Sequence, residues 1–112
     1  MPEYFFEPLA LASFHAHQAS KRDIVRGDTL FLGLNCFEPG QSQAVHAHAG
    51  ADKFYLVLSG NARMIVGDET RDAAPGTIVW APAGVPHGVE SVQQHTVMLI
   101  GLSPPPRPSA PR

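Results

Sequence analysis

The stretch GQSQAVHAHAGADKFYLVLSG, residues 40–60, decides the fold of this chain. Two histidines, His46 and His48, stand one residue apart just before a strand-like apolar run. Residues i and i+2 of a strand share a face, so the HxH pair presents two imidazoles toward one metal ion. An acid that completes such a site is expected at the start of the apolar run, where the chain instead has the cation Lys53.

Short apolar runs separated by turn residues make up most of the remaining chain. Eleven prolines and ten glycines are spread among these runs, each of which has the length of a strand. Only FFEPLALASF (5–14) has room for a helical turn, while SGNA (59–62) and GDE (67–69) are interpreted as tight hairpin connections. The pattern predicts an all-β sandwich or barrel.

The run DKFYLVLS (52–59) is apolar on both of its faces. One face is formed by alternate residues, Phe54, Leu56 and Leu58. The other face holds Lys53, Tyr55 and Val57. One face lines a core, and the other must be covered, either by the amino-terminal segment or by a second copy of the chain. We favour the second copy and predict a homodimer, in keeping with the low charged fraction of 16%.

Bulk properties exclude several classes of function. The net charge of −2 and the absence of a basic run argue against nucleic-acid binding. A single cysteine, Cys36, allows no internal disulfide and no thiolate metal cluster. No apolar run reaches the roughly 20 residues that span a bilayer, so no membrane association is expected. The amino terminus lacks the positive region of a signal peptide, and we expect a cytoplasmic protein.

Histidine spacing alone does not choose the metal site, because the chain holds a second HxH pair, His15 and His17. That pair lies in the irregular leading segment without an obvious partner. His46 and His48 precede a strong strand, and a third candidate, His87, follows a Pro- and Gly-rich loop. For a lone histidine, a hydrogen-bonded or surface role is the more common one.

The spacing of these residues resembles the two motifs of the cupin family. Gly40, His46, His48 and Gly60 fall on the first motif in register, with Lys53 in place of its glutamate. The second motif is matched in the segment 76–91 by four residues and a substituted fifth: Gly76, Pro82, Gly84 and His87, with Ser91 in place of asparagine. The chain is identified as a small single-domain bacterial cupin of the cupin 2 type, with an RmlC-like barrel.

The resemblance implies a double-stranded β-helix, a jelly-roll barrel of two antiparallel sheets with a metal site in its mouth. Its metal ligands would be His46, His48 and His87, and the ion would be divalent: Zn, Fe, Ni or Mn. Lys53 could turn away, lose its proton beside the ion, or yield the acid's place to Asp52 through a bulge. The pocket could also hold no tight metal. The favoured interpretation is a three-histidine site with Lys53 displaced.

The resemblance says less about activity, because cupins include dioxygenases, isomerases, lyases and binding proteins. As an enzyme, the chain would act on a small oxygen-rich molecule, with Lys53 or Tyr55 supporting developing charge. As a binding module, metal-free or not, it would use Lys53 to hold an anion. A barrel retained only as a dimerisation scaffold is a third hypothesis.

The predicted domain organisation has three parts. Residues 1–20 form a leading segment that packs on the barrel or swaps across it, and residues 21–102 form the barrel. Residues 103–112 form a proline-rich tail, because proline lacks the donor that sheet pairing needs.

Overall fold

The computed structural model describes residues 3–107 of the chain. These residues form one 3-10 turn, η1, and nine strands. The elements are η1 (Pro8–Leu11), β1 (Ser20–Arg26), β2 (Phe31–Phe37), β3 (Gln43–His46), β4 (Asp52–Ser59), β5 (Ala62–Val66), β6 (Glu69–Ala73), β7 (Ile78–Ala81), β8 (His87–Val92) and β9 (Thr96–Ser103).

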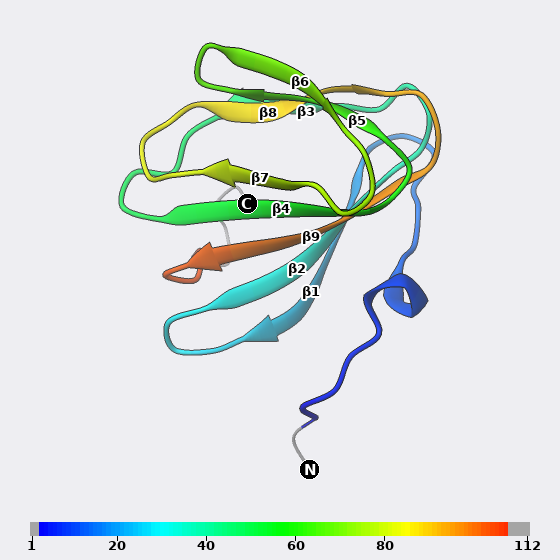
Figure 1. Ribbon diagram of the computed structural model, residues 1–112. Coiled ribbons are helices and arrows are strands. Elements are labelled where there is room, and N and C mark those ends of the chain that lie inside the picture. The colour runs from blue at the N-terminus through cyan, green and yellow to red at the C-terminus, as the bar shows by residue number, and fades with distance from the viewer. Residues whose placement is uncertain (1–2, 108–112) are drawn as a thin grey trace.

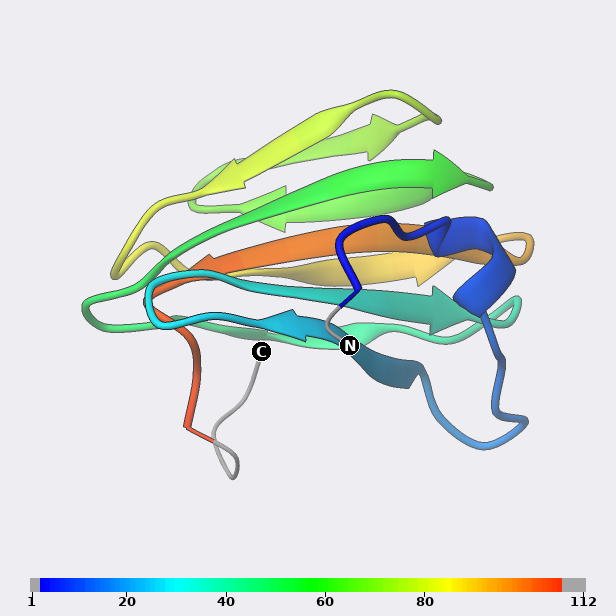
Figure 2. The ribbon, with the colours of Figure 1, turned by 90° about the horizontal axis from the view of Figure 1, so that it is seen from below.

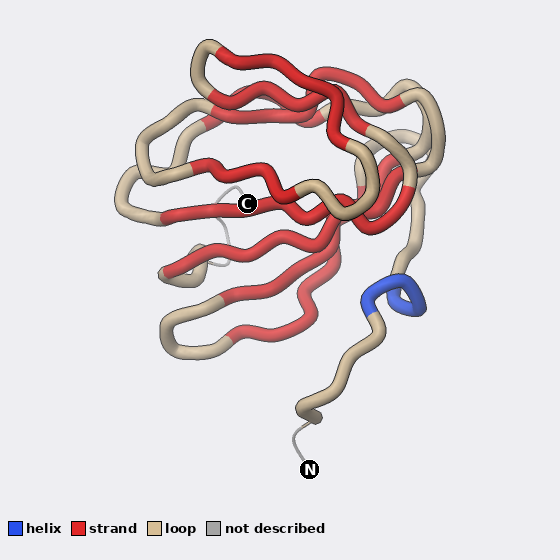
Figure 3. The backbone as a smooth tube through the Cα atoms, viewed as in Figure 1, coloured by secondary structure: helices blue, strands red, loops and turns tan. Residues whose placement is uncertain are grey.

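The strands form two antiparallel sheets that face each other (Figures 1 and 3). The five-stranded sheet has the order β1-β2-β9-β4-β7, and the four-stranded sheet has the order β3-β8-β5-β6. The predicted all-β jelly-roll barrel of two antiparallel sheets is thereby confirmed. The predicted helical turn in residues 5–14 is η1, which begins at a proline, where the fixed φ of that residue suits a helix start.

One of the two predicted hairpins is wrong. The connection at 67–69 does join paired strands, since Val66 lies opposite Glu69 across β5 and β6. The connection at 59–62 instead carries the chain from the five-stranded sheet to the four-stranded sheet, because β4 pairs with β7 and β9 while β5 pairs with β6 and β8. A turn sequence marks where the chain reverses, and it does not determine which strand becomes the partner.

The core lies between the sheets and contains alternate residues of each strand. In β4 the inward residues are Lys53, Tyr55 and Val57, all buried. The apolar members of the core are Phe31, Phe37, Tyr55, Val57, Ala62, Met64, Ala73, Val89, Val92, Met98, Ile100 and Leu102. Burying one such large side chain contributes about 1.5–3 kcal/mol. The predicted division of β4 into two faces is therefore correct, and the face with the lysine is the inner one.

The outer face of the five-stranded sheet is also apolar. Strand register places its residues in two neighbouring rows that run across the strands, which we call the outer face. One row is Leu34, Leu99, Leu56 and Ile78, and the other is Val25, Leu32, Gly101, Phe54 and Trp80. A sheet face in contact with water normally carries polar residues, so this face is unusual for an isolated barrel.

The leading segment covers one part of this outer face (Figure 2). Leu11 and Ala12 pack against a small cluster that includes Leu34, Cys36 and Leu58. Ile78 and Trp80, on the far edge strand β7, remain 66% and 54% exposed. The leading segment therefore covers one part of the outer face and leaves the part on β7 open.

Beyond β9 the chain stays close to the barrel for a few residues. Arg26 donates a hydrogen bond of 2.7 Å from Nη1 to the carbonyl oxygen of Pro106. Ser103, the first residue of the predicted tail, is the last residue of β9, and residues 108–112 lie outside the described residues. Within residues 3–107, no helix has the length and apolar character that crossing a membrane requires.

Candidate metal centre

Three histidines converge at one end of the barrel. His46 ends β3 and lies directly opposite His87, the first residue of β8. His48 follows two residues later, past the end of β3, so the HxH pair spans the strand end rather than lying within the strand. One ring nitrogen from each histidine lies within 4.8 Å of the others, and the ring centroids are 4.5–5.3 Å apart. The grouping expected from the motifs is thus present.

Backbone carbonyls fix the orientation of two of these rings. The Nδ1 of His46 donates to the carbonyl oxygen of Ala44, and the Nδ1 of His87 donates to that of Val85, each at 2.9 Å. A neutral imidazole that donates from Nδ1 carries its lone pair on Nε2. The Nε2 atoms of His46, His48 and His87 are buried and have no hydrogen-bond partner among the described residues. This donor set matches the chemistry of a three-imidazole metal site.

Burial keeps the three rings neutral. Loss of hydration is the main cause that lowers the pKa of His46, His48 and His87, and the charge of Lys53 lowers each further. For His48 the pKa falls to about 4. The rings therefore offer free electron pairs at neutral pH, as metal ligation requires.

Lys53 lies inside the barrel, where its charge acts on all three histidines, and its displacement by a bound ion stays a prediction. Its side chain is 1% exposed, and its Nζ lies 4.5 Å from the centroid of the Tyr55 ring, a cation–π contact. Strand register explains the placement, because Lys53 occupies an inward position of β4, opposite Ala81 and Leu102. The aliphatic stem packs in the apolar interior, and the aromatic face stabilises the charge.

Asp52 does not take the place of the missing acid. It points outward, and its Oδ1 accepts a hydrogen bond of 2.9 Å from the backbone N–H of Ala83. Asp52 thus fixes the loop before His87, while the lysine occupies the glutamate position of the motif.

Other residues considered from sequence have clear positions. Tyr55 is buried, its hydroxyl donates to Oε1 of Gln43 at 2.7 Å, and its ring centroid is 6.1 Å from that of His87. Burial raises the pKa of Tyr55, so this group is protonated at neutral pH.

Glu90 is exposed and contacts Arg63 at 3.8 Å, and Cys36 is buried in the cluster on the outer face. Neither of these last two residues joins the histidines.

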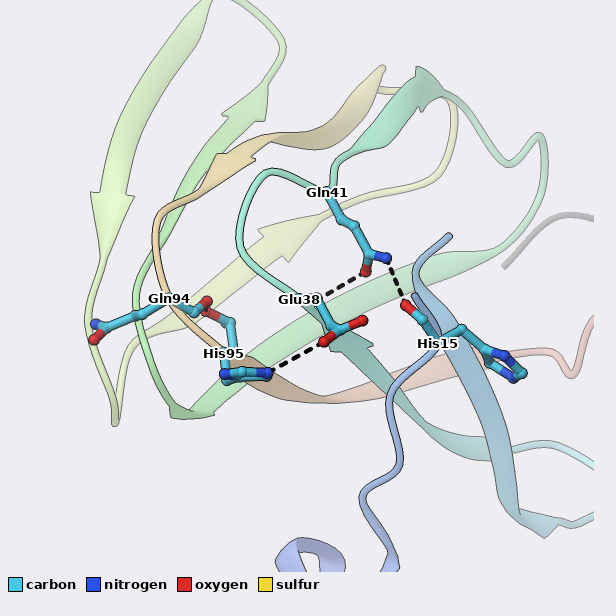
Figure 4. Close-up of polar contacts among 6 residues, drawn as sticks. His15, Glu38, Gln41, Gln94 and His95 are labelled. Carbon is cyan, nitrogen blue, oxygen red and sulfur yellow. Dashed lines mark hydrogen bonds and ion pairs between the residues drawn. The ribbon is translucent and has the colours of Figure 1, made fainter. Parts of the chain in front are cut away.

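The remaining histidines lie elsewhere. Figure 4 shows the opposite end of the barrel, where Nε2 of His95 is 3.4 Å from Oε1 of Glu38. There His15 contributes its backbone carbonyl oxygen, which accepts a 2.7 Å hydrogen bond from Gln41 (Figure 4). His17 is exposed. The pair His15 and His17 is therefore separate from the candidate metal centre.

A cavity near the centre is lined by residues that sequence reasoning missed. It has a volume of about 230 Å³ and is lined in part by Lys21, Asn35 and Gln43. Both polar atoms of the Asn35 side chain are buried without a hydrogen-bond partner among the described residues. The charge of Lys21 lowers the pKa of His48, after burial and nearer charges, so this lysine lies near the site. In the sequence, the one feature that points to this cavity is the polar residue Asn35 inside an otherwise apolar run.

Two facing antiparallel sheets with histidines gathered at the barrel mouth define the cupin class of proteins. Residues 33–102, more than half of the chain, match the cupin domain of the Cupin_2 family. The chain therefore belongs to the cupin family, as the motifs predicted.

Comparisons with individual proteins agree with this assignment. An uncharacterized protein of Streptomyces coelicolor is 32% identical over 90 residues, which cover 80% of this chain and 85% of that protein. The crystal structure of TT1209 from Thermus thermophilus is similar with a TM-score of 0.87 and 33% identity, covering 91% of this chain and 98% of the other. KdgF from a Halomonas species, at 18% identity, has a TM-score of 0.81 and covers 95% and 96% of the two chains, a likeness of fold alone.

Proposed function

We propose that the protein is a metal-dependent cupin whose ion is held by His46, His48 and His87 and whose ligand is a small oxygen-rich anion. The observation that carries the proposal is the convergence of three ring nitrogens within 4.8 Å, on rings that burial keeps neutral. A buried nitrogen without a partner costs about 1–3 kcal/mol, and three together are best explained by a shared ligand. Such a donor set suits Zn, Fe, Ni or Mn.

The charges around the centre favour an anionic ligand. The residue in place of the usual acid is Lys53, and Lys21 lies nearby. A divalent ion together with these lysines makes the pocket strongly electropositive, which favours a carboxylate or a sugar acid. The neighbouring cavity offers the amides of Asn35 and Gln43, which suit the oxygens of such a molecule.

Roles for the chain's own residues follow from these positions. A bound divalent ion would supply Lewis acidity to a ligand oxygen. Lys53 would hold negative charge on the ligand, whether that charge is permanent or develops in a reaction. Tyr55 would act through position, because its hydroxyl already donates to Gln43 and its ring supports the ammonium of Lys53.

Elemental analysis of protein prepared without an affinity tag tests the metal site. About one equivalent of a transition metal per chain is expected, and His46→Ala, His48→Ala or His87→Ala should each lose most of it. His15→Ala and His17→Ala are matched controls, because they remove an HxH pair that lies apart from the centre. Equal losses in both groups would overturn the assignment.

A metal-free binding module is the second candidate, and the buried position of Lys53 favours it. In that case the metal content is negligible, yet a small carboxylate binds. Calorimetry with simple carboxylates and sugar acids, with and without chelator, separates the two candidates. Binding that survives chelation and is lost in Lys53→Met supports the metal-free module.

Homodimer formation is the third part of the proposal. It is supported by the two apolar rows of the outer face, of which Ile78 and Trp80 stay largely exposed in one chain. Large apolar patches on a single chain mark interaction sites, and a second copy with the same patch is the simplest complementary partner.

A further inference from the structure

The amino-terminal arm, residues 3–7, is aromatic and exposed. Tyr4 is 79% exposed and Phe5 is 92% exposed, which is extreme for side chains of this size. In Figure 1 the arm leaves η1 and runs away from the barrel. Two neighbouring aromatic residues presented to water indicate a segment whose packing partner is not its own barrel.

The continuation of the arm already packs on the outer face. Leu11 and Ala12, at the end of η1, cover the part of the face near Leu34. When extended, the arm spans about 17 Å, close to the roughly 19 Å width of a five-stranded sheet. An arm of this length is therefore long enough to cross such a sheet and reach the exposed Trp80 on β7.

Charge on the two surfaces is complementary. The segment from Glu3 to Phe14 contains two glutamates and no lysine or arginine. On strand β1, at one edge of this sheet, the exposed cation Arg22 lies opposite Leu34 of the outer face. An acidic aromatic arm and an apolar face with an arginine at its edge fit each other in sign and character.

We propose that the arm of each chain lies across the outer face of a second copy, so that two arms are exchanged about a two-fold axis. The inference rests on the homodimer proposed above and adds that residues 3–7 form part of the interface. Each copy then covers the partner's Trp80 region with Tyr4 and Phe5. The exchange is reciprocal, as in every two-fold interface.

Arm variants test this exchange. Sedimentation should show a dissociation constant at least tenfold higher for Tyr4→Glu/Phe5→Glu than for the wild type, because two charges would enter an apolar contact. Val45→Glu is the matched control, since it alters an exposed apolar residue on the four-stranded sheet and should change nothing. An unchanged dissociation constant in the arm variant refutes the exchange but leaves the dimer standing. A monomeric wild type instead refutes the dimer itself.

Disulfide trapping identifies the chain on which the arm lies. In a Cys36→Ala background, a chain carrying Phe5→Cys and Trp80→Cys is oxidised and its mass is measured under denaturing conditions. A covalent dimer is expected. A covalently closed monomer would mean that the arm folds onto its own sheet, and no disulfide at all would mean that it does not reach this face; either result overturns the proposal. Replacing Trp80→Cys by Val45→Cys should abolish the covalent link between arm and sheet.

Discussion

Lys53 stands where the cupin motif has a metal-binding glutamate. The position is an inward one on β4, and the lysine side chain is buried there. What changes is the charge at the centre, from an anion that attracts a metal ion to a cation that repels one. The Tyr55 ring and the apolar interior hold the lysine in place.

Reversing this exchange should strengthen metal binding. Lys53→Glu places a carboxylate at an inward position next to three imidazoles, and the affinity for Zn, Mn or Ni should rise at least tenfold, about 1.4 kcal/mol. Competition with a chromophoric chelator measures the change. Asp52→Ala is the control, since Asp52 bonds Ala83 and faces outward, and it should alter metal affinity little. Loss of metal in Asp52→Ala with no gain in Lys53→Glu would reverse our assignment.

His48 should make stability depend on pH. Its pKa is about 4 when folded and 6.5 when unfolded, so between these values the unfolded chain binds a proton that the folded chain does not. This contribution is complete above pH 6.5 and is lost as the pH falls toward 4. Urea unfolding of metal-free protein near neutral pH and at about pH 5 should show the loss, and His48→Gln should reduce it. An identical loss in the variant would contradict this origin.

The grouping of the three histidines could be predicted from sequence, because their spacing matched two motifs, and the structure brings them together. It did not reveal the inward position of Lys53 or the role of Asp52. Both depend on which side of β4 faces the core. Because both faces of this strand are apolar, the sequence does not determine that side. Asn35 was missed for a related reason, since its importance lies in the cavity that distant strands form around it.

At the level of elements, the connection between β4 and β5 controls the passage from one sheet to the other. Gly60 has φ of +85° and lies so close to His95 and Thr96 that a Cβ would collide with their backbone. Thr96 is buried, and its hydroxyl bonds both the N–H and the carbonyl of Asn61. The short turn is therefore fixed against the start of β9.

Gly60→Ala should be far more destabilising than Gly76→Ala. Both residues have φ near +90°, where alanine costs about 1–2 kcal/mol. Only at Gly60 does the added methyl group also meet backbone, which should cost a further 1–3 kcal/mol or so. Chemical denaturation of the two variants measures the difference, and equal losses would mean that the turn can shift freely.

Strand positions were largely predictable, because each apolar run ends at turn residues. The sheet to which each strand belongs was not, and the assumed hairpin at 59–62 shows why. β4 finds its partners in β7 and β9, more than 20 residues away in sequence, and such distant pairing leaves no local signal at the turn.

For the whole molecule, the outer face should govern assembly. Light scattering at micromolar concentration should give about 24 kDa, twice the 12.0 kDa chain. Leu56→Lys places an unpaired charge in the middle of an apolar row and should yield monomer or aggregate. Val45→Lys, on the four-stranded sheet, should remain dimeric. A wild type that stays monomeric and soluble when dilute would disprove assembly through this face.

The position of His46 at the end of β3 has a consequence for solubility. β3 is a four-residue edge strand, its pairing with β8 is irregular, and an open strand edge is a template for association with other chains. An ion bound by both His46 and His87 would link β3 to β8. Chelation should then speed backbone hydrogen exchange in β3 more than in β9, and it should shorten the shelf life of the protein through edge-to-edge aggregation.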